Sequence, residues 1–245
     1  MLTLFEGGGH FQLRLVSLCP KLRRTSTVET AYSMTTARKF VLAPLVTLLL
    51  VSQSLTAGAE TVLNKSVTYF AVGGRTAAEL DEALSSQGPQ MRETGARHPG
   101  ATRIKFGGTV SYVRRGAVCA VGKARVTLNT RLILPRWTNR NSAGRDLGLV
   151  WDTLSSDIRR HEERHAEIAR NNARDMERAL LSLPPEKDCE RMQARVARVS
   201  EDAILAHDKE QAAFDRREAI NFDLRMVRLL QYRLERLKAQ PSATR

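Results

Sequence analysis

A short motif, His161-Glu162-Glu163-Arg164-His165, contains the residues of this chain whose types and spacing most clearly indicate chemistry. On a helix, residues i and i+4 project from the same face one turn apart, so both imidazoles can bind one metal ion. Glu162 would lie beside that ion, where its carboxylate can take a proton from a metal-activated water and pass it to a leaving amine. The spacing therefore predicts a zinc site, with His161 and His165 as ligands and Glu162 as the general base of peptide hydrolysis.

The helix that carries this motif is predicted to be amphipathic. One face, followed in steps of three and four residues, holds mainly apolar side chains and the two histidines: Trp151, Leu154, Ile158, His161, His165, Ile168 and Met176. Arginines and glutamates occupy the other faces. The alternative is a pair of histidines on a solvated helix, but this register predicts buried imidazoles, which need polar partners that a metal would supply.

A catalytic zinc ion usually has three protein ligands, so a third one is expected on the helix that follows. Pro184-Pro185 separates the two predicted helices, and equal counting on both sides of Pro185 places His207 opposite the motif. Asp215 is the other candidate. It lies eight residues further on, about 12 Å along a straight helix, and would require a bend or a longer turn. Weaker candidates are Glu201, Asp208, Glu210 and Glu218.

The elements around the motif indicate an α+β protein. Residues 60–142 are rich in Val, Ile and Thr in alternating patterns, which predicts a small antiparallel β-sheet region with a short helix. A capping box beginning at Thr76 predicts the start of that short helix. Residues 143–240 predict a long antiparallel α-helical hairpin that carries the HExxH motif. Both halves are expected to form one mature domain.

The stretch at residues 34–59 has the three parts of a secretory signal peptide. Basic Arg38 and Lys39 precede an apolar run, and small residues follow up to an expected cleavage site after Ala59. Residues 1–33 are either an extension or the result of a misassigned start, with Met34 as the initiator. We therefore expect a periplasmic or secreted bacterial protein without a stable membrane span after signal cleavage.

The cysteines agree with export. Cys19 lies upstream of the expected cleavage site, which leaves Cys119 and Cys189 as an even pair for an oxidising compartment. We predict a disulfide between them that would join the β-rich half to the helical hairpin.

The composition limits the class of protein. The chain has 245 residues, 42% of them hydrophobic and 27% charged, which excludes a wholly disordered chain. The formal net charge of +13 permits contact with anionic surfaces, but only 5% of residues are aromatic. Together with export, this low aromatic content argues against nucleic-acid binding. The expected partner is a protein or peptide substrate, and the oligomeric state stays open.

The motifs together resemble the DUF922 family, bacterial secreted zinc-dependent proteases that contain HExxH. The similarity covers most of the expected mature chain and rests on the stretches 69–76, 134–137, 151–152 and 158–165, with His207 and Phe214-Asp215 as later matches. The resemblance implies a zinc metallopeptidase.

The sequence thus predicts a secreted or periplasmic zinc-dependent metalloendopeptidase that hydrolyses peptide bonds through a metal-activated water. The alternative is a non-catalytic cell-envelope binding protein with a structural metal or none. A third reading is a protein that carries or senses metal, which weak and reversible metal affinity would indicate.

Overall fold

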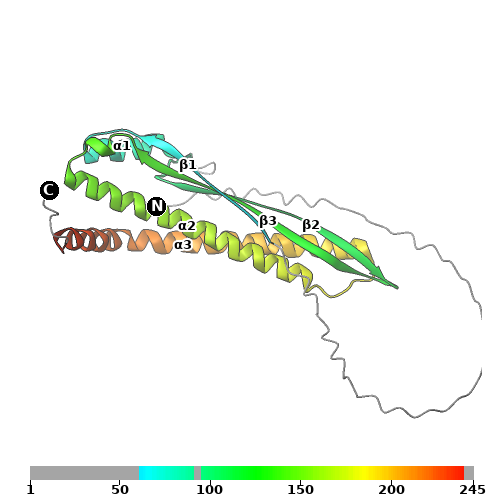
Figure 1. Ribbon diagram of the computed structural model, residues 1–245. Coiled ribbons are helices and arrows are strands. Elements are labelled where there is room, and N and C mark those ends of the chain that lie inside the picture. The colour runs from blue at the N-terminus through cyan, green and yellow to red at the C-terminus, as the bar shows by residue number, and fades with distance from the viewer. Residues whose placement is uncertain (1–60, 91–94, 240–245) are drawn as a thin grey trace, which may run out of the picture. The chain divides into compact units, whose positions relative to one another are not determined.

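The computed structural model describes residues 61–90 and 95–239. The expected signal peptide at 34–59 and the upstream segment 1–33 lie outside the described residues. Figure 1 shows the described part as a narrow sheet beside a pair of long helices. The elements in chain order are β1 (Val62–Val72), α1 (Ala77–Gln87), β2 (Ala101–Arg115), β3 (Val118–Trp137), a 3-10 turn (Arg140–Ser142), α2 (Arg145–Leu181) and α3 (Cys189–Ala239).

The sheet has three strands in the order β1-β3-β2. Strands β2 and β3 form the expected antiparallel hairpin, which turns at Gly116 with a φ of +63°, a value that favours glycine. Strand β1 pairs with the other side of β3 and runs parallel to it, from Val62 opposite Thr127 to Val72 opposite Trp137. The α+β class is therefore confirmed, but the small sheet is mixed and not wholly antiparallel as expected, because β1 joins it in parallel. Alternation within β1 does not reveal which edge of the hairpin it joins.

Helix α1 begins where the capping box predicts. The Thr76 hydroxyl accepts a hydrogen bond from the Glu79 amide at 3.2 Å, and the Glu79 carboxylate accepts one from the Arg75 amide at 2.6 Å. Buried residues of α1 then pack against Val72, Trp137 and Trp151. This cluster fastens the ends of β1 and β3 to the start of α2.

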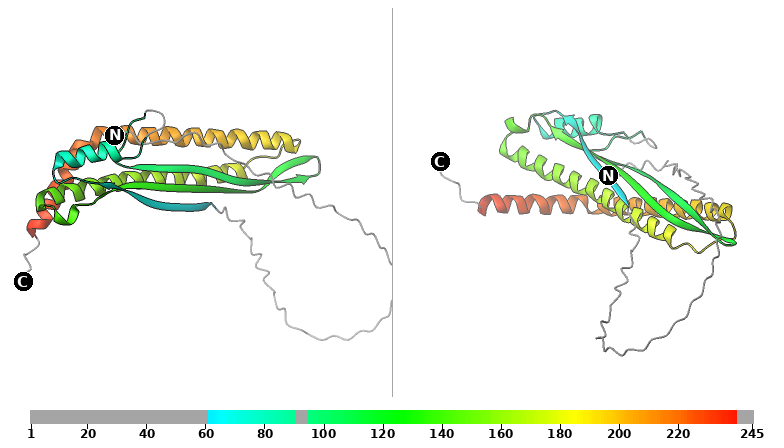
Figure 2. Two further views of the ribbon diagram at one scale, coloured as in Figure 1. Left: turned by 90° about the horizontal axis from the view of Figure 1, so that it is seen from above. Right: turned by 45° about the vertical axis from the view of Figure 1, so that its right-hand side comes forward.

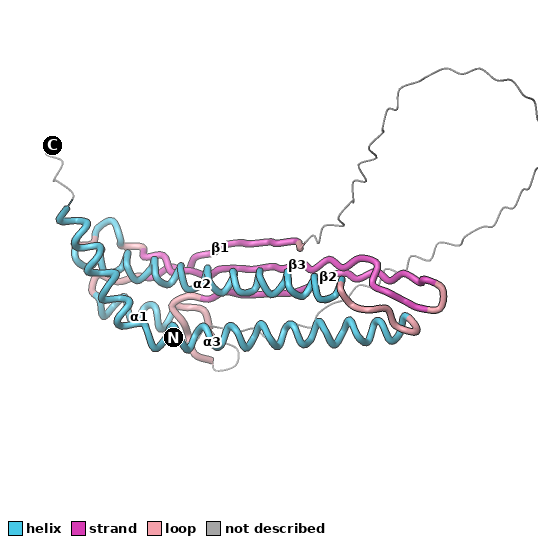
Figure 3. Tube along the Cα trace, turned by 90° about the horizontal axis from the view of Figure 1, so that it is seen from below, coloured by secondary structure: helices cyan, strands magenta, loops and turns pink. Residues whose placement is uncertain are grey.

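Helices α2 and α3 run antiparallel along the strands, as Figures 2 and 3 show. The expected break is confirmed, because α2 ends at Leu181 and α3 starts at Cys189. The Asp188 carboxylate accepts a hydrogen bond from the Arg191 amide at 2.8 Å and so caps α3. No helix in the described ranges is long and apolar enough to cross a membrane.

The main core lies between β3 and the helical hairpin. Residues of β3 alternate between buried and exposed, and the buried set includes Val126 and Leu128. These side chains pack with Ala173 and Met176 of α2 and with Val196 of α3. The helices thus cover one face of the sheet, and this packing fixes the position of α2 along the strands.

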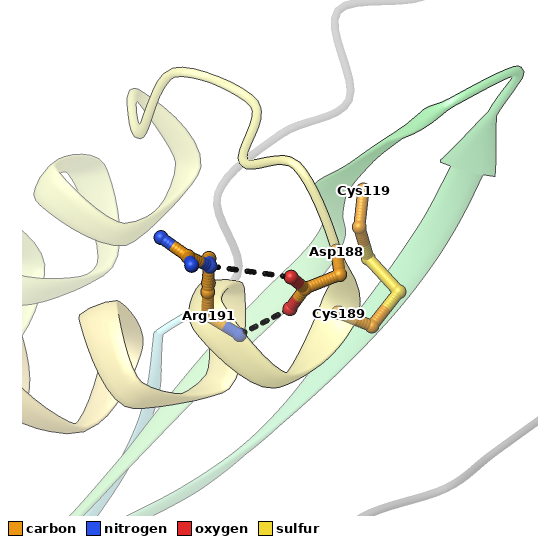
Figure 4. The surroundings of a disulfide bond; sticks show 4 residues. All are labelled: Cys119, Asp188, Cys189 and Arg191. Carbon is orange, nitrogen blue, oxygen red and sulfur yellow. Dashed lines mark hydrogen bonds and ion pairs between the residues drawn. A yellow bond between two sulfur atoms is a disulfide. The ribbon is translucent and has the colours of Figure 1, made fainter.

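The predicted disulfide between Cys119 and Cys189 is confirmed. It joins the start of β3 to the first residue of α3, and Figure 4 shows it beside the Asp188 cap. The backbones of Cys119 and Glu186 also exchange two hydrogen bonds of 2.8 Å. The segment between α2 and α3 is therefore attached to the tip of the β-hairpin at two neighbouring points.

Removing this disulfide should lower the free energy of unfolding. The two cysteines are 70 residues apart, and by the chain-entropy model the loss is about 4 kcal/mol at most. Denaturant unfolding of Cys189→Ser should show a lower midpoint than that of the unaltered protein. A reducing agent is the control: it should lower the midpoint of the unaltered protein and leave that of Cys189→Ser unchanged. Equal midpoints for Cys189→Ser and the unaltered protein would contradict a stabilising role for the bond.

Candidate metal centre

The two histidines of the motif are buried on α2, as the register predicts. His161 is 1% exposed and His165 is 2% exposed, and neighbouring Ile158 and Ile168 are buried on the same helix. The rings lie with centroids 4.7 Å apart, and their Nε2 atoms are separated by 3.0 Å. The alternative of two solvated histidines does not describe this structure.

Asp215 of α3 completes a group of three potential donors. Its Oδ1 atom lies 3.0 Å from Nε2 of His165 and 3.3 Å from Nε2 of His161. All three residues are buried, and their donor atoms lie within 4.8 Å of one another. Of the two candidates for the third position, the structure brings Asp215 to the histidines.

His207 lies outside this group, although it is also buried. The segment between the helices is not a symmetric turn, because Glu186 pairs with Cys119 at the tip of the β-hairpin before α3 begins. Helix α3 therefore starts further out and reaches the level of the motif about two turns later than equal counting predicts. The residue of α3 that faces the motif is therefore Asp215 and not His207.

Gln211 connects His207 to the centre and was not predicted from the sequence. Its Oε1 atom is hydrogen-bonded to Nδ1 of His165, and its Nε2 atom donates to the His165 carbonyl oxygen at 3.0 Å and lies 2.9 Å from Nε2 of His207. One oxygen and two N–H groups account for all three contacts. With the hydrogen of that bond on Nδ1, the lone pair of His165 Nε2 faces Asp215 and His161.

The contact with Gln211 also bears on the protonation state of His207. Its Nε2 atom accepts from Gln211, and Nδ1 lies 3.1 Å from a carboxylate oxygen of Asp208. The Phe106 ring contacts it edge-on at 4.9 Å. Burial lowers the pKa of His207 to about 4, which keeps the imidazole neutral near pH 7. His207 thus lies behind Gln211 and is not one of the three donors.

Glu162 lies on the side of α2 that faces the sheet and is fully buried. The Thr102 hydroxyl of β2 lies 2.8 Å from its Oε2 atom. The Oε1 atom has no hydrogen-bond partner among the residues that the structure describes. Burial raises the pKa of Glu162, while the nearby histidines oppose that rise. A buried carboxylate oxygen is costly unless a hydrogen-bond donor or a cation lies beside it, so Oε1 is placed to receive one.

Gly100 allows this close approach of β2 to α2. A Cβ atom at Gly100 would lie 3.0 Å from Oε1 of Glu162 and 2.7 Å from the Ile158 side chain. The adjacent Glu163 differs from Glu162, because its carboxylate pairs with Lys65 of β1. The two glutamates of the motif thus have separate environments, and only Glu162 belongs to the centre.

Two side chains of α3 border the histidines. The Phe214 ring lies 5.0 Å from the rings of both His161 and His165. The Glu218 carboxylate is 3.5 Å from Nδ1 of His161 and also pairs with Arg160 and Arg225. Burial raises the pKa of Glu218, but the two arginines lower it by more, so the carboxylate is ionised. Hydrogen bonding to Nδ1 directs Nε2 of His161 toward the centre.

His98 is a further residue near the centre that sequence reasoning missed. It is 8% exposed, and burial lowers its pKa. His161 lowers that pKa as well, whereas Asp215 opposes the change. His98 precedes β2 without any recognisable motif, so its place beside the centre depends on the sheet packing against α2.

The donor set suits a divalent zinc ion. Ligand atoms about 2.0–2.1 Å from a tetrahedral zinc lie about 3.3–3.4 Å from one another. The three separations here are 3.0 to 3.3 Å. Burial alone lowers the pKa of His165, but Asp215 and Glu162 raise it by more, so these carboxylates favour positive charge at this point. His161, His165 and Asp215 therefore fit one zinc ion.

A cleft of about 680 Å³ opens next to the centre. Its walls come from β1, β3, α2 and α3, and they include Phe214 and Glu218, which contact the histidines. The three donors themselves do not line it. Access from this cleft to the centre would pass Phe214 and Glu218.

The neutral state of His207 predicts a pH dependence of stability. Since the folded-state pKa is about 4 and the usual value is 6.5, the unfolded chain binds a proton that the folded chain does not. This contribution is complete above pH 6.5 and is lost as the pH falls toward 4, with about 2 kcal/mol lost between pH 7 and pH 5.

His207→Gln should therefore show a smaller loss of unfolding free energy over that range than the unaltered protein. Asp208, Glu210 and His165 also surround this position, and their effects cancel because they are common to both proteins. Parallel stability curves from urea unfolding at pH 5, 6 and 7 would contradict a neutral buried His207.

Comparison with protein families gives a match, whereas comparison with individual proteins does not. No curated protein and no solved structure matches the chain significantly. The model of the family described as "Bacterial protein of unknown function (DUF922)" matches residues 67–222, more than half of the chain. This range contains the three donors, Glu162 and the disulfide. The chain therefore belongs to the DUF922 family.

Proposed function

We propose that this protein is a zinc-dependent peptidase. The observation that carries the proposal is the buried group of His161, His165 and Asp215, with the unpartnered Oε1 atom of Glu162 on the same helix. Two imidazoles and one carboxylate would hold the zinc ion and leave one position of a tetrahedral site open. A zinc ion held there supplies Lewis-acid chemistry, polarising a carbonyl group and lowering the pKa of water.

Glu162 is the proposed general base. Its burial raises its pKa, which makes the carboxylate a stronger base. Oε1 would receive the proton of the attacking water and deliver it to the departing amine nitrogen. Thr102 holds Oε2 at 2.8 Å, so the orientation of the carboxylate is fixed before substrate arrives.

The residues behind the histidines support the same role. Gln211 hydrogen-bonds Nδ1 of His165, and Glu218 lies 3.5 Å from Nδ1 of His161. Ligand histidines in zinc sites commonly have such partners, which fix the ring and its tautomer. The adjacent cleft of about 680 Å³ is within the range of ligand pockets and could accommodate part of a peptide.

We also propose that the protein acts in the periplasm or outside the cell. The signal-peptide pattern at residues 34–59 supports export, and the Cys119–Cys189 disulfide supports an oxidising compartment. The substrate would be a protein or peptide in that compartment.

A second candidate function is a non-catalytic envelope protein with a structural metal. The observation that favours it is the burial of all three donors, none more than 3% exposed, which restricts access to the ion. Such a protein would lose stability when the metal is removed but would hydrolyse no peptide.

Metal binding should depend on Asp215 and not on His207. Purified protein saturated with zinc and then desalted should contain one zinc per chain by elemental analysis. Asp215→Ala and His165→Ala should lose at least about tenfold in zinc affinity because each removes a donor. His207→Gln is the matched control, a buried residue of the same helix whose change should leave one zinc per chain. Loss of zinc from His207→Gln with retention in Asp215→Ala would contradict the assigned donor set.

Hydrolysis should depend on Glu162 even when zinc is retained. Glu162→Gln keeps the shape of the side chain but removes the base, so kcat should fall at least about 100-fold in a peptide-library digest. Glu190→Gln, an exposed glutamate of α3 outside the cleft, is the control and should cleave at the unaltered rate. Cleavage by Glu162→Gln at that rate would remove the assigned base, and no cleavage by the zinc-loaded unaltered protein would favour the structural-metal function.

A further inference from the structure

A small pocket whose walls include three arginines lies at the ends of β1 and β3, beside the first half of α2. Its volume is about 250 Å³, and Tyr69, Arg136, Trp137, Trp151 and Arg159 are among its walls. Stretches 69–76, 134–137, 151–152 and 158–165, noted above for the family resemblance, thus meet here. Of these four stretches, only the last contains residues of the metal centre.

The two arginines converge on Tyr69. The Arg159 guanidinium donates a hydrogen bond to the Tyr69 hydroxyl at 2.7 Å, and the Arg136 guanidinium lies 4.1 Å from the centroid of the Tyr69 ring. The contact with Arg159 lowers the pKa of Tyr69. Because the tyrosine oxygen accepts from Arg159, its own hydrogen can be donated to a ligand.

Neither arginine is neutralised by a carboxylate within the part of the chain that the structure describes. Arg140, which also lines the pocket, shows the contrast, because two of its nitrogens donate to Asp152 at 2.8 and 2.6 Å. Arg136 and Arg159 therefore place two uncompensated positive charges at one small cavity. Such a pair favours an anionic group with several acceptor sites.

The remaining walls combine apolar side chains with the hydroxyl groups of Ser155 and Ser156. They include Leu134, Pro135 and the rings of Trp137 and Trp151, whose centroids are 5.5 Å apart. The indole N–H of Trp137 is already donated to the Gly74 carbonyl oxygen at 2.9 Å, so this ring offers only its apolar surface. A volume of about 250 Å³ is below the roughly 300–1,000 Å³ of common ligand pockets, so it fits one end group and its stem.

We infer that this pocket binds a carboxylate carried on a short apolar stem, either the C-terminus or an acidic side chain of a peptide ligand. The guanidinium groups and the Tyr69 hydroxyl would donate to the two oxygens, and the tryptophan rings would cover the stem. Residues two apart on a helix point about 200° from one another, so Arg159 and His161 face different sides of α2. The inferred site is therefore separate from the zinc centre and does not depend on hydrolysis.

The chain offers a direct signal for this site. It contains two tryptophans, Trp137 and Trp151, and both line the pocket. Intrinsic fluorescence of the full protein therefore reports on ligand entry. Glu162→Gln is the background for the titrations, because it removes turnover and lies outside the pocket.

The probes are N-acetyl-trialanine with a free C-terminal carboxylate, its C-terminal amide, and an amide of the same length with one glutamate. The free carboxylate should change the fluorescence saturably and the simple amide should not; a response to the glutamate amide would identify side-chain carboxylates as a second source. Arg136→Gln and Arg159→Gln should each weaken the binding at least about tenfold, because each loses a charged hydrogen-bond donor. Arg174→Gln, an exposed arginine of α2 that lines neither this pocket nor the cleft beside the metal centre, should not change it.

Equal responses to the carboxylate and the simple amide, or binding unaffected by both pocket substitutions, would overturn the inference. Inorganic phosphate binding more tightly than the carboxylate peptide would overturn the carboxylate assignment. Circular dichroism of Arg136→Gln and Arg159→Gln should show unaltered helix content, so that weaker binding reflects the lost donors. Failure of these titrations would leave the zinc and cleavage measurements unaffected, and the reverse also holds.

Discussion

Three atoms that a nearby positive charge would stabilise lie close together in the interior of this protein. Nε2 of His161, Nε2 of His165 and Oδ1 of Asp215 are separated by 3.0 to 3.3 Å, and none of the three side chains is more than 3% exposed. Removing such groups from water is costly unless a charge compensates them. The packing of α2, α3 and the sheet maintains this arrangement, and a bound cation would stabilise it.

The sheet determines the environment of the base. Strand β2 approaches α2 closely only because Gly100 has no side chain, and Thr102 then contacts Glu162. The disulfide and the Glu186–Cys119 pairing fix where α3 begins, which decides that Asp215 rather than His207 reaches the histidines. The position of the third donor is therefore a consequence of the connection at the far end of the hairpin.

Much of this could be predicted from local sequence patterns. Helical periodicity placed His161 and His165 on a buried face, Thr76 marked the start of α1, and cysteine counting paired Cys119 with Cys189. These features depend on residues close in sequence or on the number of cysteines. Each of these local patterns corresponds to one structural feature.

The features that could not be predicted depend on how distant segments pack. The parallel pairing of β1 depends on which edge of the hairpin it joins, and the choice between His207 and Asp215 depends on a two-turn shift of α3. Gln211, Thr102 and His98 have ordinary sequence surroundings, and only the tertiary structure brings them to the centre.

The central claim is that His161, His165 and Asp215 bind one zinc ion. X-ray diffraction from crystals of the zinc-saturated protein, recorded on both sides of the zinc absorption edge, tests it most directly. The account predicts one anomalous peak about 2.0–2.2 Å from both Nε2 atoms and from an oxygen of Asp215. A peak bound instead to His207 or to surface residues, or no peak between α2 and α3, would contradict it.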